Sequence, residues 1–498
     1  MAFFNASGCH TGGIKAQAGR FRSIPICPGI IFSGGDFRTT GKARRQITFK
    51  AGKELYPILK AEKTKEENME KFFKFKEHET NLKTETTAGV TTFMTMAYII
   101  FVNPFILSGA GMDFGAVMTA TIIAAGVTTI LMGLLTNYPF ALASGMGLNA
   151  FFAFVVAAQF GWQAALGAVF ISGIVFLILS VTGAISHIDA AVPTSLKSAV
   201  AAGIGLFIAF IGLQNAGIIV GSEATQVALG DLSSPGPALS LIGILIIAVL
   251  MARKVRGAIL IGILLTTIVS FIMGFQPLPS GLGDIFGPPA SLSPIFLELD
   301  LRAALAIPFF VIFSFVFVDV FDTMGTLLGT GARAGFLDKD GRLPKVNKAM
   351  LADSIGTMGG ALLGTSTVTT YIESTAGISE GGRTGFTSVV TGILFFLTLF
   401  LAPLAGLVPA EATAPALIIV GVLMVGAVAK IDFEDFTEAL PAFLTIIFMP
   451  LAYSIADGIA FGFIAFPLVK VVAGKGKEVH WLLYLLAIVS LIHFFWPA

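Results

Sequence analysis

The chain has 498 residues, of which 55% are hydrophobic and only 12% charged, and its mean hydropathy is +0.88. A soluble globular protein carries about 25% charged residues, so an ordinary soluble enzyme is excluded. A formal net charge of +1 offers no basic surface of the kind that binds nucleic acid. Residues 1–85 hold 16 of the 31 Lys and Arg and 9 of the 30 Asp and Glu. The rest is poor in charge and rich in long apolar stretches, which predicts an all-α polytopic membrane protein embedded in the lipid bilayer.

The N-terminal region differs from the rest of the chain. Residues 1–68 are basic, rich in turn-forming residues and without regular periodicity, so we expect a disordered, dispensable extension or sequence upstream of a wrongly assigned start codon. Residues 69–85 form a short amphipathic basic segment, expected to lie on the cytoplasmic face of the membrane. Both cysteines, Cys9 and Cys27, fall in the first region, so no thiolate metal site is predicted in the membrane part.

Apolar segments then recur in two halves, 86–275 and 300–498. Two of these segments, 146–160 and 371–379, are too short to cross a bilayer and are rich in Gly, Ser and Thr. They occupy corresponding places in the two halves. Paired, interrupted segments of this kind indicate a binding site near the membrane midplane of an inverted-repeat transporter. Ordinary packing of helices through small residues is the alternative.

The charges of the loops give an orientation. Loops 253–256 and 331–348 carry three and five basic residues, whereas loops 215–237 and 275–301 carry acidic residues and no Lys or Arg. Counting spans from a cytoplasmic N-terminus places both basic loops inside and both acidic loops outside. This arrangement obeys the positive-inside rule and is consistent with a multi-pass protein of the cell membrane.

Four carboxyl groups lie within predicted membrane segments. Burying one charge at mid-bilayer costs at least ~2.5–3.5 kcal/mol on insertion scales, so each is a candidate functional residue. Asp319 and Asp322 are three residues apart and share one helix face, while Glu373 and Asp457 lie in later segments. A purely structural role, with the carboxyl protonated or hydrogen-bonded to Ser or Thr, is the alternative, and it has more weight for Asp319 and Asp457.

Carboxylates beside interrupted helices suit a planar ligand with N–H donors, because a carboxylate accepts two hydrogen bonds side by side. Asn149 can both donate and accept at the edge of such a ligand, and Gly147 would let the backbone approach it closely. Phe321 could supply a stacking surface, although most of the 46 phenylalanines must face lipid or pack helices.

Other chemistry has little support. No phosphate-binding Gly-x-x-x-x-Gly-Lys-Ser/Thr motif is present, and the five histidines show no metal-ligand spacing, so neither a metal nor another cofactor is predicted. Gly281-Leu282-Gly283-Asp284 matches a signature of intramembrane aspartyl proteases. That reading is remote, since such enzymes also use a Tyr-Asp pair and no tyrosine here is followed by Asp.

Several long motifs resemble one transporter family. They comprise Thr86–Pro104, Gly145–Phe152, Phe321–Thr326, and Gly364–Gly377 with Gly381–Gly385. From residue 69 to the C-terminus the sequence resembles the nucleobase:cation symporter-2 superfamily, in the adenine/guanine/hypoxanthine (AzgA-like) branch of purine permeases.

This resemblance implies a seven-plus-seven inverted repeat with a core domain, a gate domain and two half-helices preceded by short strands. It implies a symporter that imports purine nucleobases with protons and is not an enzyme. The implied ligand-contacting residues are Asp322, Glu373 and Asn149, and Gly147, Thr370 and Phe321 complete the expected substrate site. The candidates for proton coupling are Asp322, Glu373, Asp319 and Asp457.

Within the expected site, Glu373 is predicted to accept purine N–H groups as the anion and Asp322 to carry the proton, with the reverse assignment left open. The alternatives are an anion transporter of the sulfate-permease type, which has the same fold, and a channel. The role of segment 480–496 and the oligomeric state, with a homodimer as one option, are also open.

The predicted topology can be tested with cysteines placed at Asp284 and Lys339. Because loop 275–301 should face outward and loop 331–348 inward, an impermeant thiol reagent added to intact cells should label position 284 only. Labelling of position 339 without position 284 would show the opposite orientation.

Overall fold

The computed structural model describes residues 69–185, 188, 191–339 and 341–495. The expectation of disorder for residues 1–68 lies outside the described residues. In the described part, nine helices are long and apolar enough to cross a bilayer, and four shorter apolar helices accompany them. The prediction of a polytopic helical membrane protein is confirmed.

The first half runs from residue 82 to residue 272. Its elements, in chain order, are α2 (Leu82–Met96), α3 (Ile99–Ser108), α4 (Phe114–Thr136), β1 (Leu142–Ser144), α5 (Met146–Phe151), a π-helical turn (Phe152–Val156), α6 (Ala157–Phe160), α7 (Trp162–Thr182), α9 (Thr194–Asn215), β2 (Ile219–Ser222), β3 (Gln226–Leu229), α10 (Pro235–Ala252) and α11 (Ala258–Ile272).

The second half repeats this order. Its elements are α12 (Leu301–Ala304), α13 (Phe309–Ala334), α14 (Val346–Leu363), β4 (Val368–Thr370), α15 (Ser374–Ser379), α16 (Gly385–Leu397), α17 (Ala402–Ala405), α18 (Ala410–Val425), α19 (Phe436–Leu451) and α20 (Ile455–Val472), followed by α21 (Trp481–Phe495). In both halves the third segment is a short strand followed by a short helix, which is the expected seven-plus-seven inverted repeat. Segment 480–496 contains α21, a helix added after the second repeat.

The two short strands pair with each other across the halves. β1 and β4 are antiparallel, with Leu142 opposite Thr370 and Ser144 opposite Val368. The ladder is extended at both ends by backbone bonds from Gly145 N–H to Thr367 and from Tyr371 N–H to Ala141. Unpaired backbone N–H and C=O groups are very costly in a bilayer, so each strand supplies the partners that the other requires.

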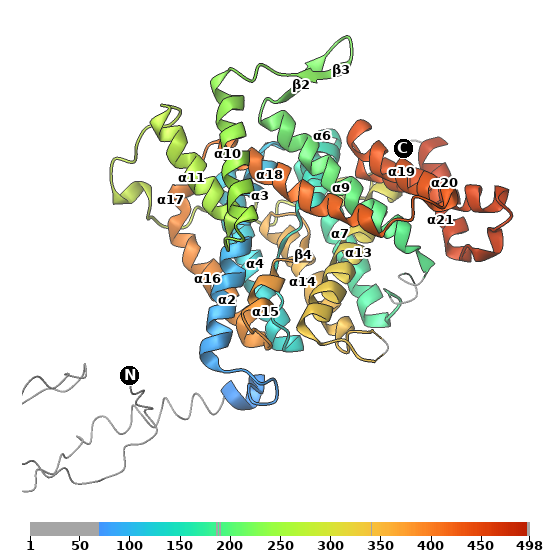
Figure 1. Cartoon of the computed structure of the whole chain (residues 1–498), viewed down its shortest axis with the longest axis horizontal. Helices are drawn as coiled ribbons and strands as arrows, with labels where there is room; N and C mark the ends of the chain where they lie inside the picture. The colour runs from blue at the N-terminus through green and yellow to red at the C-terminus, as the bar shows by residue number, and fades with distance from the viewer. Residues whose placement is uncertain (1–68, 186–187, 189–190, 340, 496–498) are drawn as a thin grey trace, which may run out of the picture. The chain divides into compact units, whose positions relative to one another are not determined.

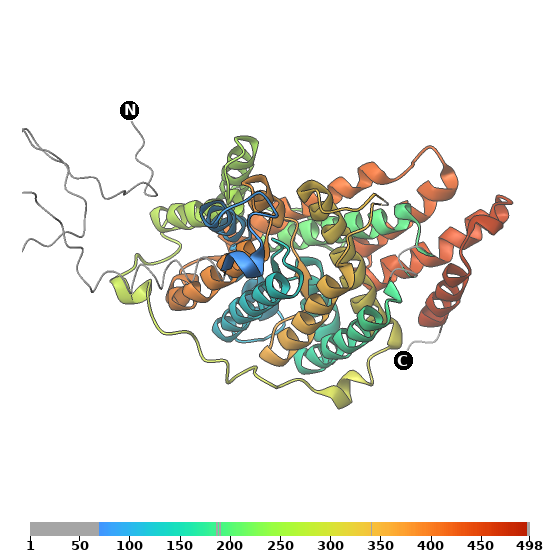
Figure 2. The same cartoon turned by 90° about the horizontal axis from the view of Figure 1, so that it is seen from below.

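The helices pack in two groups. In the first group, α4 packs against α14 and α16, α7 packs against α14, and α2 packs against α15 and α16. In the second group, α18 packs against α9, α10 and α11, and α19 packs against α9 and α20. Both groups draw helices from both halves of the chain, as Figures 1 and 2 show by colour. They correspond to the expected core and gate domains.

Glycines allow the closest helix contacts in both groups. A Cβ on Gly385 of α16 would lie 2.0 Å from the carbonyl oxygen of Gly133 on α4, and a Cβ on Gly421 of α18 would lie 2.5 Å from that of Gly205 on α9. Small residues at such crossings permit the backbone approach on which helix association in lipid depends.

One feature of the loops was not expected from the sequence. The connection between α9 and α10 contains a small hairpin in which β2 pairs with β3, with Ile219 opposite Leu229. The connection from α11 to α12 is long, and Figure 2 shows it running along the outside of the helices. Both lie in loops whose charge predicts an external location.

A buried carboxylate joins the start of the first span to the second half. Glu85 on α2 is fully buried, and it accepts hydrogen bonds from the backbone N–H of Arg383 at 2.9 Å, that of Thr384 at 3.3 Å and the Thr387 hydroxyl at 2.6 Å. These donors lie at the N-terminus of α16, where helix N–H groups lack intrahelical acceptors. Glu85 therefore caps a helix that follows it by about 300 residues.

We expect Glu85→Ala to lower the free energy of unfolding by about 2–3 kcal/mol, because several buried donors lose a charged acceptor. Thermal unfolding of the protein in detergent would measure the loss. Lys83→Ala, an exposed change on the same helix, is the matched control and should leave the midpoint unchanged. Equal midpoints for the two variants would show that the Glu85 contacts contribute no net stability.

Candidate functional site

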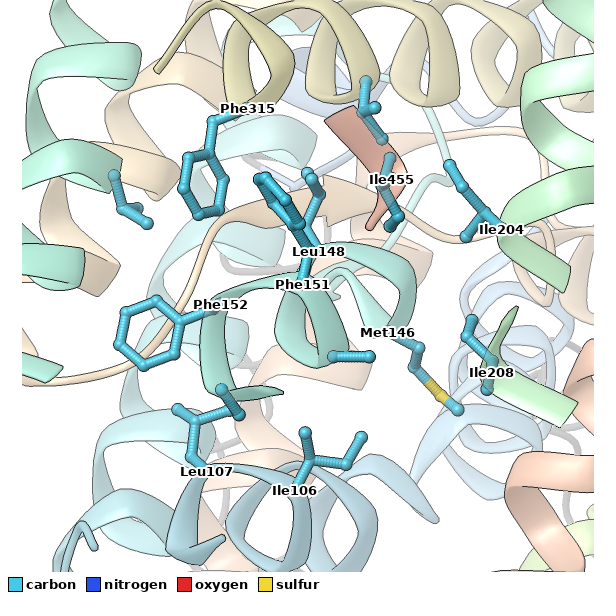
Figure 3. Packing of buried hydrophobic residues seen from close by; sticks show 14 of the residues in the cluster. Ile106, Leu107, Met146, Leu148, Phe151, Phe152, Ile204, Ile208, Phe315 and Ile455 are labelled. Carbon is cyan, nitrogen blue, oxygen red and sulfur yellow. The ribbon is translucent and has the colours of Figure 1, made fainter. Parts of the chain in front are cut away.

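The two half-helices start where the paired strands end. α5 follows β1 directly after Gly145, and α15 follows β4 after Glu373. Apolar side chains hold α5 between neighbouring helices, with Met146 and Leu148 among Ile204 and Ile208 of α9 and Ile455 of α20, as Figure 3 shows. The start of each half-helix is thereby fixed near the crossing of the strands.

Glu373 lies at the head of α15 and is only partly buried. Its Oε1 accepts a hydrogen bond of 2.6 Å from the hydroxyl of Tyr98. Tyr98 stands in a break of the first span, between α2 and α3, one and a half turns before Pro104, which cannot donate a backbone hydrogen bond. Because the hydrogen bond from Tyr98 holds Oε1, it also fixes the orientation of the whole carboxylate. The second oxygen is then able to accept hydrogen bonds from a ligand.

A cavity of about 600 Å³ leads to Glu373. Its lining comes from α2, from α10, α11 and the turn between them, from the end of α13, from α15 with its flanking residues, and from α18. The lining residues are Thr91, Thr95, Met251, Lys254, Val255, Arg256, Gly257, Ala258, Ile259, Arg333, Ile372, Glu373, Thr375, Ala376, Ser379, Glu380 and Leu423. Residues of both basic loops, Arg256 and Arg333, line this one cavity, so the two loops lie at the same end of the protein. That end is the one predicted to be cytoplasmic.

Asp322 is the second partly exposed acid of the site. It lies on α13, within electrostatic range of Glu373. One turn further on, a Cβ added to Gly325 would meet nothing within 4 Å, so this face of α13 borders open space. Both acids belong to the second half of the chain, and the first half contributes through Tyr98.

Two further carboxyl groups lie deeper, behind Asp322. Asp319 is 1% exposed and accepts a hydrogen bond from the Thr357 hydroxyl at 2.9 Å, while its other oxygen has no partner among the described residues. Asp353 on α14 is fully buried and accepts from Thr323 at 2.8 Å and from Thr370 at 3.2 Å. Each acid has one supported oxygen, and the two influence each other electrostatically.

Sequence reasoning missed Asp353. It lies in the apolar segment 347–364, which the sequence predicts to be an ordinary membrane span. The available signal was the same as for Asp319, a carboxyl group within a span and a threonine four residues later, Thr357. Thr370, expected at the substrate, directs its hydroxyl to Asp353 instead.

The remaining expected site residues differ in their surroundings. Asn149 is fully buried on α5, and neither its amide nitrogen nor its oxygen has a partner in the part of the chain that the structure describes. A Cβ on Gly147 would lie 2.3 Å from Cγ2 of Ile204, so this glycine allows α5 to approach α9. Phe321 packs 4.3 Å from the ring of Phe317 and lies beneath Nζ of Lys197, at 5.4 Å.

Asp457 lies apart from the other acids. Its Oδ1 is 3.0 Å from Nε2 of His493 on α21, and the His493 ring stacks on Phe310. Phe310 precedes Asp322 by twelve residues on α13, about 18 Å along the helix axis. The structure therefore brings together Asp322, Glu373, Asp319 and Asp353, and it places Asp457 with α20 and α21.

Other chemistry finds no support in the described part of the chain. No group of three His, Cys, Asp or Glu is arranged to hold a metal ion there. Asp284, part of the protease-like signature, lies in the long connection after α11, where its carboxylate accepts hydrogen bonds from the backbone and hydroxyl of Ser280.

Comparison with known proteins finds relatives along most of the chain. A permease of Methanocaldococcus jannaschii is 55% identical over 86% of this chain and 98% of its own. The guanine/hypoxanthine permease PbuG of Bacillus subtilis is 46% identical over 86% and 99%, and the adenine permease AdeP of Escherichia coli is 44% identical over 82% and 92%.

Among solved structures, the transmembrane domain of a cyanobacterium bicarbonate transporter, BicA, matches with a TM-score of 0.56. The match covers 75% of this chain and 97% of that domain, at 17% identity. At this identity the likeness shows the fold alone, and it confirms the inverted-repeat architecture.

The permease family, of the xanthine/uracil type, matches residues 83–461. This range contains both half-helices, the paired strands and all the acids discussed above. The match and the identities of 44–55% confirm the resemblance seen in the motifs. The chain therefore belongs to the xanthine/uracil permease family of membrane transporters, alongside the adenine and guanine/hypoxanthine permeases.

Proposed function

We propose that this protein is a secondary transporter that imports purine nucleobases (adenine, guanine and hypoxanthine) together with protons across the cell membrane, with its N-terminus in the cytoplasm. The observation that carries the proposal is the cavity ending on the Tyr98–Glu373 pair, in a chain 44–46% identical to permeases named for these bases. The cavity begins at residues of the basic loops, and the proposed topology places this opening on the cytoplasmic side.

The carboxylate of Glu373 is suited to a purine because adjacent N–H groups on the ring edge can donate to it. Tyr98 donates to one oxygen and so orients the group before the ligand arrives. The unpartnered amide of Asn149 is the candidate for a second polar contact, since a fully buried amide without partners is costly. Gly147, Thr370 and Phe321 are proposed to shape this site indirectly. Gly147 does so through the close approach of α5 to α9, Thr370 through its hydrogen bond to Asp353, and Phe321 through its contact with Lys197.

Proton coupling is proposed to reside in Asp322. Two nearby carboxyl groups in a low-dielectric site cannot both ionise cheaply, so one of them carries a proton when Glu373 is the anion that binds substrate. When Asp322 is protonated, the core domain carries one negative charge fewer through the membrane than when both carboxyl groups are ionised. Asp319 and Asp353, held by hydroxyls behind Asp322, are candidates for sharing that proton. Asp457 lies apart from them, beside His493.

The acids also argue against the anion-transporter alternative. A bound anion is stabilised by positively charged donors, whereas the inner end of this cavity presents the carboxyl group of Glu373. The proposal is tested by uptake of radiolabelled hypoxanthine, guanine, adenine, xanthine and uracil in a permease-deficient host, with and without an uncoupler. Uptake that an uncoupler does not affect would indicate a channel or a facilitator.

Glu373→Gln should weaken purine binding at least about tenfold, because an amide replaces an acceptor by a donor and removes a charge-assisted bond of about 1.5–3 kcal/mol. Tyr98→Phe should have a smaller effect, since the carboxylate remains. Equilibrium binding of labelled hypoxanthine to purified protein measures both. Glu411→Gln, on α18 outside the cavity lining, is the matched control, and normal affinity in Glu373→Gln would remove Glu373 from the site.

Asp322→Asn should still bind purine, with a weaker dependence on pH, but should fail to concentrate it. The amide keeps the size of the carboxyl group and cannot take up or release the proton. Accumulation in vesicles with an imposed proton gradient measures the difference. Asp113→Asn is a suitable control because asparagine caps a helix as well as aspartate does. Uncoupler-sensitive accumulation by Asp322→Asn would assign the proton to another group.

A further inference from the structure

The cavity is larger than a free nucleobase requires. Its volume of about 600 Å³ falls in the range that encloses a drug-sized molecule, whereas a purine is a single bicyclic ring. A base bound at Glu373 would fill the inner end and leave the outer part empty. That outer part is lined by a different kind of residue.

Three cations line the outer part of the cavity. Lys254 and Arg256 come from the turn between α10 and α11, and Arg333 comes from the end of α13. Arg256 forms an ion pair with Glu380, which follows α15. Among the described residues, neither Lys254 nor Arg333 has a carboxylate within ion-pair distance, so the mouth carries an excess of positive charge that faces the same space as Glu373.

The depth of the cavity fits a nucleotide. Glu373 precedes α15, and Glu380, the ion-pair partner of Arg256 at the mouth, follows it. Seven residues at 1.5 Å each therefore place the mouth, which Lys254 and Arg333 also line, about 10 Å from Glu373. This is similar to the length of a nucleoside monophosphate from the hydrogen-bonding edge of its base to its phosphate. A phosphate carries a charge of about −1.5 to −2 at neutral pH, which suits a mouth with unpaired cations.

We propose that the cavity also binds purine nucleoside 5′-monophosphates, the phosphoribosylated forms of the transported bases, with the base at Glu373 and the phosphate at Lys254 and Arg333. The inference rests on the proposed function and adds a regulatory ligand to the same site. The ribose phosphate reaches from the core helices to the turn of the gate, so it prevents the core from moving past the gate. The nucleotide therefore inhibits from the cytoplasmic side, without being transported.

A displacement experiment on purified protein in detergent, where both faces are accessible, tests the proposal. Labelled hypoxanthine is competed with inosine 5′-monophosphate, inosine, ribose 5-phosphate and inorganic phosphate. The monophosphate should compete at least about tenfold better than inosine, as expected for charge-assisted bonds to its phosphate. Ribose 5-phosphate and inorganic phosphate, which lack a base, should not displace hypoxanthine.

Variants separate the two ends of the cavity. In Lys254→Gln/Arg333→Gln the advantage of the monophosphate over inosine should disappear. Arg253→Gln removes a neighbouring cation of the same turn that does not line the cavity, and it should keep both the advantage and normal hypoxanthine binding. An advantage that persists in the double variant, or a monophosphate no better than inosine in the wild type, overturns the inference.

The outcomes also distinguish this inference from the proposed function. Binding of hypoxanthine without a preference for the monophosphate overturns the nucleotide site and leaves purine transport standing. Failure of the wild-type protein to bind any of the labelled bases overturns the proposed function, and the nucleotide site with it. Displacement by inorganic phosphate alone would reveal a general anion site and contradict the nucleotide assignment.

Discussion

The antiparallel contact between β1 and β4 is the constraint on which the rest of the structure depends. Extended backbone inside a membrane has no water to satisfy it, so neither strand could exist there without the other. The pairing joins residues 142–144 to 368–370, and the flanking bonds from Gly145 and Tyr371 continue it. Because α5 and α15 start where the strands end, this ladder fixes the positions of Asn149 and Glu373, and it ties the two halves into one core.

Carboxyl groups of the core are stabilised by hydrogen bonds from neutral hydroxyl groups. Glu373 receives a tyrosine hydroxyl, and Asp319 and Asp353 receive threonine hydroxyls, which are neutral donors that stabilise a carboxylate without neutralising it. A lysine or arginine partner would instead form an ion pair and hold the charge permanently. Neutral donors leave each carboxyl group free to gain and lose a proton, which the proposed coupling requires.

The contact between core and gate explains how the site could be opened and closed. A Cβ on Gly147 would lie 2.3 Å from Cγ2 of Ile204 on α9, so α5 and α9 approach each other closely, and the side chains packed around this contact are apolar (Figure 3). The Arg256–Glu380 pair, by contrast, links the gate turn to the end of α15 at the open mouth. In the proposed transport cycle an apolar surface can slide, whereas this ion pair must break, so the mouth is the place where a bound ligand would affect the movement.

Sequence by itself determined the features that depend on local pattern: the membrane segments, the interrupted third segment of each half, the common location of the two basic loops, and Asp322 and Glu373 as polar residues in apolar surroundings. Hydrophobicity and charge are properties of a segment, so they can be read before folding. Tertiary structure alone decided which residues meet. Tyr98 donates to Glu373, 275 residues away in the sequence, and Glu85 caps α16. Thr370 donates to Asp353, and Asp457 contacts His493. Such contacts are set by how helices pack and not by the spacing of residues along the chain.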